Sequence, residues 1–215
     1  MRYQYGESRG RLSPLLFLSA LAVVVGVLGG CGSSDSGQDV QPEPEAAAAG
    51  SSRCPTKSDA RALAARGVDW NDCDLNHADL TSAYLRDAKL TDAKLIRANL
   101  TGSDLTGAKL SYADLIYADL GGSNLTGARL NGADLRYADL TSASLRDASL
   151  RYTNLTSANL RYADLSGADL RHAYLGGANL TEANLSGANL SAATCNNSTR
   201  WPDGAKGHGS TCPKP

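Results

Sequence analysis

The side chains of this 215-residue sequence that could carry out chemistry are its carboxylates, its three histidines and its five cysteines. Carboxylates such as Asp114 and Asp134 are 20 residues apart, and a chain that coils with this period would stack them like a catalytic pair. A regular repeat produces such stacks automatically, so they do not indicate catalysis. No Ser/His/Asp arrangement, phosphate-binding loop or metal-ligand helix is recognisable in the sequence. We therefore expect a protein that is not an enzyme and uses no cofactor.

The element that must position these side chains is a five-residue repeat, with a Leu at every fifth position from Leu75 to Leu190, 24 times in succession. Ala fills 20 of the 24 places two residues before the Leu, and Asp or Asn fills 16 of the 24 places directly before it. A period of five leaves no continuous buried face on an α-helix and alternates faces on a β-strand. The chain must therefore turn at every repeat and stack on itself as a solenoid, with Leu and Ala pointing inward.

Runs such as NHADL at 76–80 and RYADL at 136–140 resemble the pentapeptide-repeat family, and the resemblance covers about 125 of the 215 residues. It implies an all-β fold, a right-handed quadrilateral β-helix with four repeats per coil and therefore about six coils. All seven Pro residues lie outside 71–195, which suits a structure whose backbone N–H groups bond from coil to coil.

Both ends of the solenoid are expected to carry caps, because an open end would expose the apolar interior. The segment SDARALAAR predicts a short helix that begins at Ser58 or Asp59 and covers the first coil with Leu63 and its alanines. Trp70 falls in the register of the Leu residues, and Trp201 is expected to lie over the last coil.

The N-terminal segment has the layout of an export signal, because three Arg residues precede an apolar run from Leu12 to Leu28 that ends in small residues before Cys31. The run is short for a permanent membrane helix, which is one alternative. The sequence LGGC at 28–31 resembles the lipobox of bacterial lipoproteins, which implies lipidation of Cys31; ordinary secretion is the other alternative. The expected organisation is a signal peptide at 1–30, a disordered tether at 31–53, an N-terminal cap at 54–70, the β-helix at 71–195 and a C-terminal cap or tail at 196–215.

Four cysteines remain if Cys31 carries lipid, and an even number in an exported chain suggests two disulfides. Three pairings are open, but about six coils separate the two ends, so distance favours Cys54 with Cys73 and Cys195 with Cys212. Zinc binding is the alternative, although the sequence contains no CxxC pair and its histidines do not cluster with the cysteines.

Projection of the outward residues onto 20-residue coils gives one side where cations and tyrosines gather. Lys89, Lys109 and Arg129 align just before the Leu. Arg151 and Arg171 align just after it. Some of the tyrosines share a column with His172. Such a surface can contact a protein, a glycan or an anionic polymer, and the alternative is an ordinary solvated face. The candidate partner surface consists of Lys89, Lys109, Arg129, Tyr112, Tyr117, Tyr137 and Tyr152.

The sequence thus predicts a non-enzymatic, lipid-anchored solenoid of the cell envelope that acts as an interaction or structural scaffold for an unidentified envelope protein or glycan. Some pentapeptide-repeat proteins resemble DNA and bind DNA gyrase, which makes a gyrase-binding or gyrase-protecting protein an alternative. Residues 71–195 carry 14 acidic and 11 basic residues, a net charge of −3 that is small for a DNA-like rod. Export also argues against this alternative, and we expect no nucleic-acid partner. A glycan-binding envelope protein is the second alternative.

Overall fold

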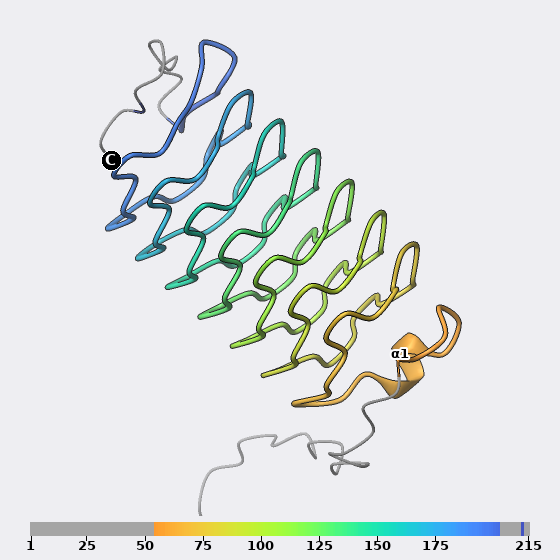
Figure 1. The fold of residues 1–215 in the computed structure, drawn as a ribbon. Coiled ribbons are helices and arrows are strands. Elements are labelled where there is room, and N and C mark those ends of the chain that lie inside the picture. Colours follow the sequence, from red (N-terminus) through yellow and green to blue (C-terminus); the bar gives the residue numbers. More distant parts are fainter. Residues whose placement is uncertain (1–53, 203–211, 213–215) are drawn as a thin grey trace, which may run out of the picture. The chain divides into compact units, whose positions relative to one another are not determined.

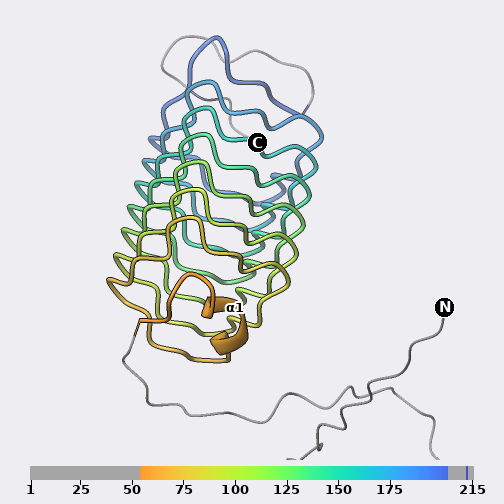
Figure 2. The same cartoon turned by 90° about the vertical axis from the view of Figure 1, so that its right-hand side faces the viewer.

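The computed structural model of the protein describes residues 54–202 and Cys212. In this part of the chain a single helix, α1 (Ala60–Leu63), precedes a long stack of coils (Figure 1, Figure 2). The expected signal peptide at 1–30, the lipidated Cys31 and the tether at 31–53 lie outside the described residues.

Neighbouring coils are joined by single parallel β-bridges instead of long strands. From Asp69↔Lys89 to Tyr174↔Thr194, every bridge joins two residues that are 20 positions apart. The bridged residue always directly precedes the inward Leu or, at the two ends, Trp70 and Cys195. One coil therefore contains four repeats, which agrees with the four-sided coil implied by the family resemblance.

Each repeat turns through a tight backbone corner. The Leu75 carbonyl accepts a hydrogen bond from the Ala78 N–H at 3.0 Å, and His77, between them, has a φ of 60°. The same position of every repeat from Gly67 to Ala192 has a positive φ. A bond from residue one to residue four of a turn, with a positive φ only at residue three, is the pattern of a type II turn.

The Asp and Asn residues before the Leu hold these corners in place. Asp79, for example, accepts a hydrogen bond at Oδ1 from the Thr81 N–H two residues later, at 3.0 Å. All 16 of the Asp and Asn residues at this position make the equivalent bond. This is the Asx turn, in which a short polar side chain supplies an acceptor to its own backbone. The abundance of Asp therefore has a structural explanation.

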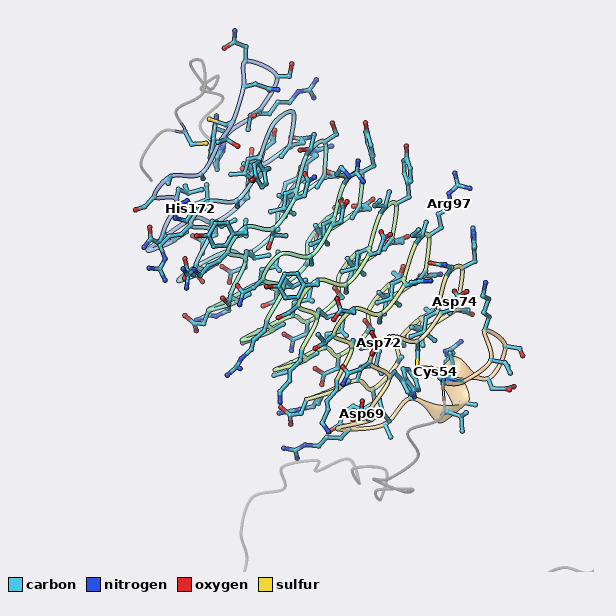
Figure 3. All side chains as sticks on the ribbon, in the orientation of Figure 1. Cys54, Asp69, Asp72, Asp74, Arg97 and His172 are labelled. Atoms are coloured by element: carbon cyan, nitrogen blue, oxygen red, sulfur yellow. A yellow bond between two sulfur atoms is a disulfide. The ribbon has the colours of Figure 1, made fainter. Side chains whose placement is uncertain are left out.

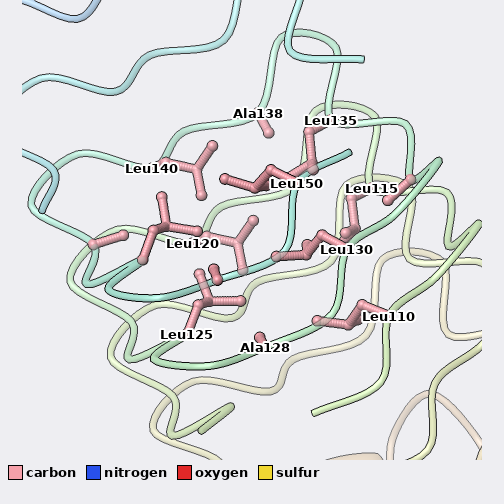
Figure 4. Close-up of a cluster of buried hydrophobic side chains, with 14 of the residues drawn as sticks. Leu110, Leu115, Leu120, Leu125, Ala128, Leu130, Leu135, Ala138, Leu140 and Leu150 are labelled. Carbon is pink, nitrogen blue, oxygen red and sulfur yellow. The ribbon is translucent and has the colours of Figure 1, made fainter. Parts of the chain in front are cut away.

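The core consists of the Leu and Ala ladders, as predicted. Leu residues from every side of the coil point into the interior, which Figure 4 shows for Leu115, Leu120, Leu125 and Leu130, one from each side of a coil. The ladder from Leu75 to Leu180 is at most 1% exposed. Only small side chains fit two positions before the Leu, because they share the interior of the coil with the Leu side chains.

The N-terminal segment matches the prediction in part. Helix α1 is one turn long and Ala60 is fully buried, whereas Leu63 is 56% exposed. The expectation that Leu63 covers the first coil is therefore wrong, because so short a helix directs only one of its side chains inward. The expected disulfide between Cys54 and Cys73 is present, with the two Cα atoms 5.3 Å apart.

The C-terminal end continues one turn beyond the expected boundary at residue 195. The last bridge, Asn179↔Arg200, spans 21 positions, so the chain accommodates one extra residue here. Thr199 takes the inward position of the Ala ladder and donates its hydroxyl to the Leu175 carbonyl at 2.8 Å. Trp201 is 3% exposed and belongs to the core. The inserted residue thus brings Trp201 into the register of the Leu ladder.

The second predicted disulfide is not formed. Cys195 and Cys212 are both free thiols, although their side chains lie close enough to interact. Burial raises the pKa of Cys212, and the contact with Cys195 raises it further. The prediction placed the correct two cysteines near each other but was wrong about the covalent bond. The number of coils between cysteines indicates which of them lie close together, but it does not show that an S–S bond forms.

Candidate interaction surface

The first part of the candidate surface is a column of three cations, Lys89, Lys109 and Arg129, which we call the basic ladder. The bridges Lys89↔Lys109 and Lys109↔Arg129 place them on one face of three successive coils. Lys89 donates to Asp69 Oδ2 at 3.0 Å, and this hydrogen bond lowers the pKa of Asp69 below its usual value. Within residues 54–202, Lys109 and Arg129 have no ion pair.

The second part is a stack formed by Arg97, Tyr117 and Tyr137, which we call the Arg–Tyr stack. The two rings are parallel within 11° and their centroids are 4.9 Å apart. The Arg97 guanidinium lies over the Tyr117 ring, 5.5 Å from its centroid. Figure 3 shows Arg97 projecting from the outer edge of its coil. The stack therefore runs along one corner of the rod, with one residue from each of three coils.

The third part lies along the neighbouring corner and contains Tyr112, Tyr152 and His172. The Tyr152 and His172 rings are stacked, with centroids 4.7 Å apart, and the Arg151 guanidinium lies 5.8 Å from the Tyr152 centroid. The Tyr112 ring rests on Gly132 of the next coil, because a Cβ atom at Gly132 would lie 2.6 Å from Tyr112 Cε1. The glycine thus leaves room for the ring, which is 67% exposed.

These tyrosines occupy a costly backbone position. Tyr112, Tyr117, Tyr137, Tyr152 and Tyr162 all have a φ between 58° and 60°. Gly adopts this left-handed conformation without strain and fills nine of the equivalent positions. For residues with a Cβ atom, this conformation costs about 1 kcal/mol or more in free energy. Their rings are about half exposed or more and do not belong to the Leu core. A strained position that repeatedly carries a large exposed ring suggests a role outside the fold.

All seven predicted surface residues lie on one face of the rod and the two corners that follow it. Lys109 and Tyr112 are three residues apart on one coil, and Tyr117 is one side of the coil further on. Sequence reasoning left Arg97 out of the surface, although its position 20 residues before Tyr117 was the signal that could have included it. A separate pair, Arg161 and Tyr162, lies half a coil away from Tyr152 and is not part of this surface.

The arrangement favours binding over catalysis. The three cations of the basic ladder and Arg97 are exposed. The stacked rings contact each other or a neighbouring guanidinium instead of surrounding a reactive group. In the described part of the chain no group of three His, Cys, Asp or Glu residues could hold a metal ion. Among those same residues, no helix has the length and apolar character needed to cross a bilayer.

The chain belongs to the pentapeptide repeat family. The family model for pentapeptide repeats matches in eight copies, over residues 65–102, 88–127, 123–161, 138–175 and 163–194. Proteins of this family adopt the right-handed quadrilateral β-helix and are generally structural or binding proteins. A comparison with functionally curated proteins found no match.

Solved structures of pentapeptide repeat proteins are similar to this chain. HetL from the cyanobacterium Nostoc sp. strain PCC 7120, which is involved in heterocyst differentiation regulation, is 29% identical, with 66% of this chain and 81% of HetL covered and a TM-score of 0.41. The Nostoc protein alr5209 is 50% identical, with 41% of this chain and 73% of alr5209 covered and a TM-score of 0.41. QnrB1, a plasmid-mediated fluoroquinolone resistance protein, is 19% identical, with 62% of this chain and 89% of QnrB1 covered and a TM-score of 0.43.

Proposed function

We propose that this protein is a non-enzymatic, lipid-anchored solenoid of the bacterial cell envelope that presents its Arg/Tyr surface to a partner. In this proposal the rod has about six coils, and α1 with the buried Ala60 covers the first one. The sequence before the described residues supports the anchor, because a basic start and an apolar run lead to LGGC at 28–31. A lipid chain on Cys31 would hold the rod at a membrane through its apolar tail, more firmly with a second acyl chain.

The observation that carries the binding role is the Arg–Tyr stack. Tyr117 and Tyr137 are 50% and 49% exposed, so their edges and hydroxyl groups face solvent. Stacking adds about 0.5–1.5 kcal/mol per aromatic pair, which offsets only part of the strain of two residues at positive φ. Rigid rings in a fixed register also lose little entropy when they bind. The surface therefore suits recognition of a partner better than it suits stabilisation of the rod.

The double variant Tyr117→Gly/Tyr137→Gly tests this role, because Gly is the residue that the corner accepts without strain. We expect its melting temperature to stay close to that of the wild type. Pull-downs from envelope fractions should lose a partner that the wild type retains.

The matched control is Tyr162→Gly/Glu182→Gly, which changes two positive-φ residues 20 positions apart on the corner opposite Tyr112. This control should recover the same proteins as the wild type. If the Tyr117/Tyr137 variant also recovers them all, the stack is an ordinary solvated face and the proposed binding surface is wrong.

The anchor is tested separately with Cys31→Ala. We expect this variant to lose incorporation of a labelled fatty acid and to be released or mislocalised, because the side chain proposed to carry the lipid is gone. Labelling that persists in the variant would exclude Cys31 as the lipidation site.

A further inference from the structure

We propose that the basic ladder, together with Tyr112, binds a short carboxylated polysaccharide. This inference rests on the proposed binding function and names a partner class for one part of the surface. It concerns the face that carries Lys109 and Arg129, which is distinct from the corner that carries the Arg–Tyr stack.

The first step is that Lys109 and Arg129 replace the Asp or Asn residue that holds the corner in most repeats. An Asp or Asn at their position would accept a hydrogen bond from the N–H two residues later. After Lys109 and Arg129, the N–H groups of Ser111 and Asn131 have no acceptor among the residues that the structure describes, and the same holds after Tyr84, Ser144 and Tyr174. By contrast, the Thr91 N–H, which follows Lys89, is bonded by Asn71 Oδ1 at 2.8 Å. The feature that sets Lys109 and Arg129 apart is therefore their charge.

The second step is that the ladder concentrates positive charge. Bridged residues on adjacent coils are about 4.8 Å apart, and like charges directly opposite each other destabilise a sheet. Lys89 is neutralised by Asp69, but Lys109 and Arg129 face each other without a carboxylate partner within residues 54–202. An anionic ligand would remove this repulsion. Two neighbouring cations that lack the Asx bond and repel each other form a site that an anionic ligand would stabilise.

The third step concerns the length of the charged stretch. Asp69 precedes the ladder in its column, and Ser149 and Asp169 follow it. Asp169 is bonded by Arg171, which lowers the pKa of that carboxyl. The three cations therefore span about 10 Å, two coil intervals, between polar or acidic ends. This length suits a short stretch of polymer that lies along the rod axis.

The fourth step is the adjacent ring. Tyr112 lies three residues after Lys109 on the same coil, and its ring is held against Gly132 with two thirds of its surface exposed. A tyrosine ring offers an apolar face for the C–H groups of a sugar and a hydroxyl for its polar groups. A cation ladder beside such a ring matches a sugar polymer that carries carboxylates.

The same geometry disfavours the other polyanions. The faces of the rod are already paired from coil to coil, so an acidic peptide lying along the ladder would find no strand edge for its backbone. A nucleic acid gains its affinity from many phosphate contacts, whereas this ladder offers three cations in a repeat domain of net charge −3. A polysaccharide needs only side-chain contacts.

The test measures binding of the full-length protein to oligogalacturonate by calorimetry, with neutral dextran, poly-glutamate and an oligo-dT strand as comparison probes. The decisive variant is Lys109→Asn/Arg129→Asn, which restores the Asx residue at both positions. We expect its dissociation constant for oligogalacturonate to rise about tenfold or more, while its melting temperature stays equal or rises. Wild-type binding should weaken as NaCl is raised, because the charges are exposed.

Lys94→Asn/Arg161→Asn is the matched control, since it removes the same charge from other parts of the rod and should bind like the wild type. Equal binding by the decisive variant, or no binding by the wild type, would overturn the proposal. Tighter binding of poly-glutamate or oligo-dT than of oligogalacturonate would overturn the choice of polysaccharide. A negative result here together with a partner lost in the Tyr117/Tyr137 pull-down would leave the proposed scaffold function intact, so the two failures are distinguishable.

Discussion

Ser103 and Ser123 provide a matched pair of buried hydroxyl groups on neighbouring coils. Both residues replace Ala at the inward position, both are 1% exposed, and they are 20 residues apart. Ser123 Oγ donates to the Leu120 carbonyl at 2.7 Å, whereas Ser103 Oγ is buried and has no partner in the part of the chain that the structure describes. The same substitution, Ser to Ala, should therefore have opposite effects on stability at the two sites.

The magnitudes follow from the hydrogen bonds. A buried hydroxyl without a partner costs about 1–3 kcal/mol, so Ser103→Ala should raise the free energy of unfolding by about 1 kcal/mol after allowance for relaxation. Ser123→Ala removes a bond worth about 0.5–1.5 kcal/mol. It leaves no orphan acceptor, because the Leu120 carbonyl also accepts from the Ser123 N–H at 3.0 Å. The two variants should thus differ by about 2 kcal/mol.

Urea unfolding followed by circular dichroism measures this difference, with the wild type as reference. The two midpoints should move in opposite directions from that of the wild type. If both variants are destabilised equally, the Ser103 hydroxyl bonds to the Leu100 carbonyl as its counterpart does on the next coil. That result would refute the assignment of Ser103 as an unsatisfied group and the reasoning from it.

Three further predictions concern the core, the N-terminal disulfide and the response to acid. Leu130→Ala, at a fully buried site, should lower the free energy of unfolding by about 3–5 kcal/mol in the same urea assay, and a loss below about 1 kcal/mol would contradict the inward assignment. Reduction of Cys54–Cys73, which are 19 residues apart, should lower stability by about 3 kcal/mol, and melting that is unchanged by dithiothreitol would contradict this. The hydrogen bond from Arg171 lowers the pKa of Asp169 below its usual 3.8, so its contribution is present above that pH and is lost as the pH falls through the lower folded value. Asp169→Asn should therefore show a smaller loss of stability between pH 4 and pH 2 than the wild type, and identical acid unfolding curves would refute the assignment.

The sequence alone determined the inward and outward faces of the chain. A Leu at every fifth position and a small residue two places earlier can be buried together only if the backbone turns at each repeat, and burial confirms this from Leu75 to Leu180. For a coil of 20 residues, adding 20 to a residue number gives its neighbour on the next coil, which places the basic ladder and the tyrosines in their columns. These features are readable because the repeat makes every local environment the same.

Only the tertiary structure decided what happens between coils and where the repeat changes. It showed that Arg97 lies over Tyr117, that Ser103 lacks the bond that Ser123 makes, and that one extra residue brings Thr199 and Trp201 into the core. It also showed Cys195 and Cys212 in contact as thiols. Each of these depends on which side chain a given residue meets on the next coil or at the end of the stack. The period of the sequence fixes the column of a residue, but the rotamers and contacts within that column arise only when the coils pack.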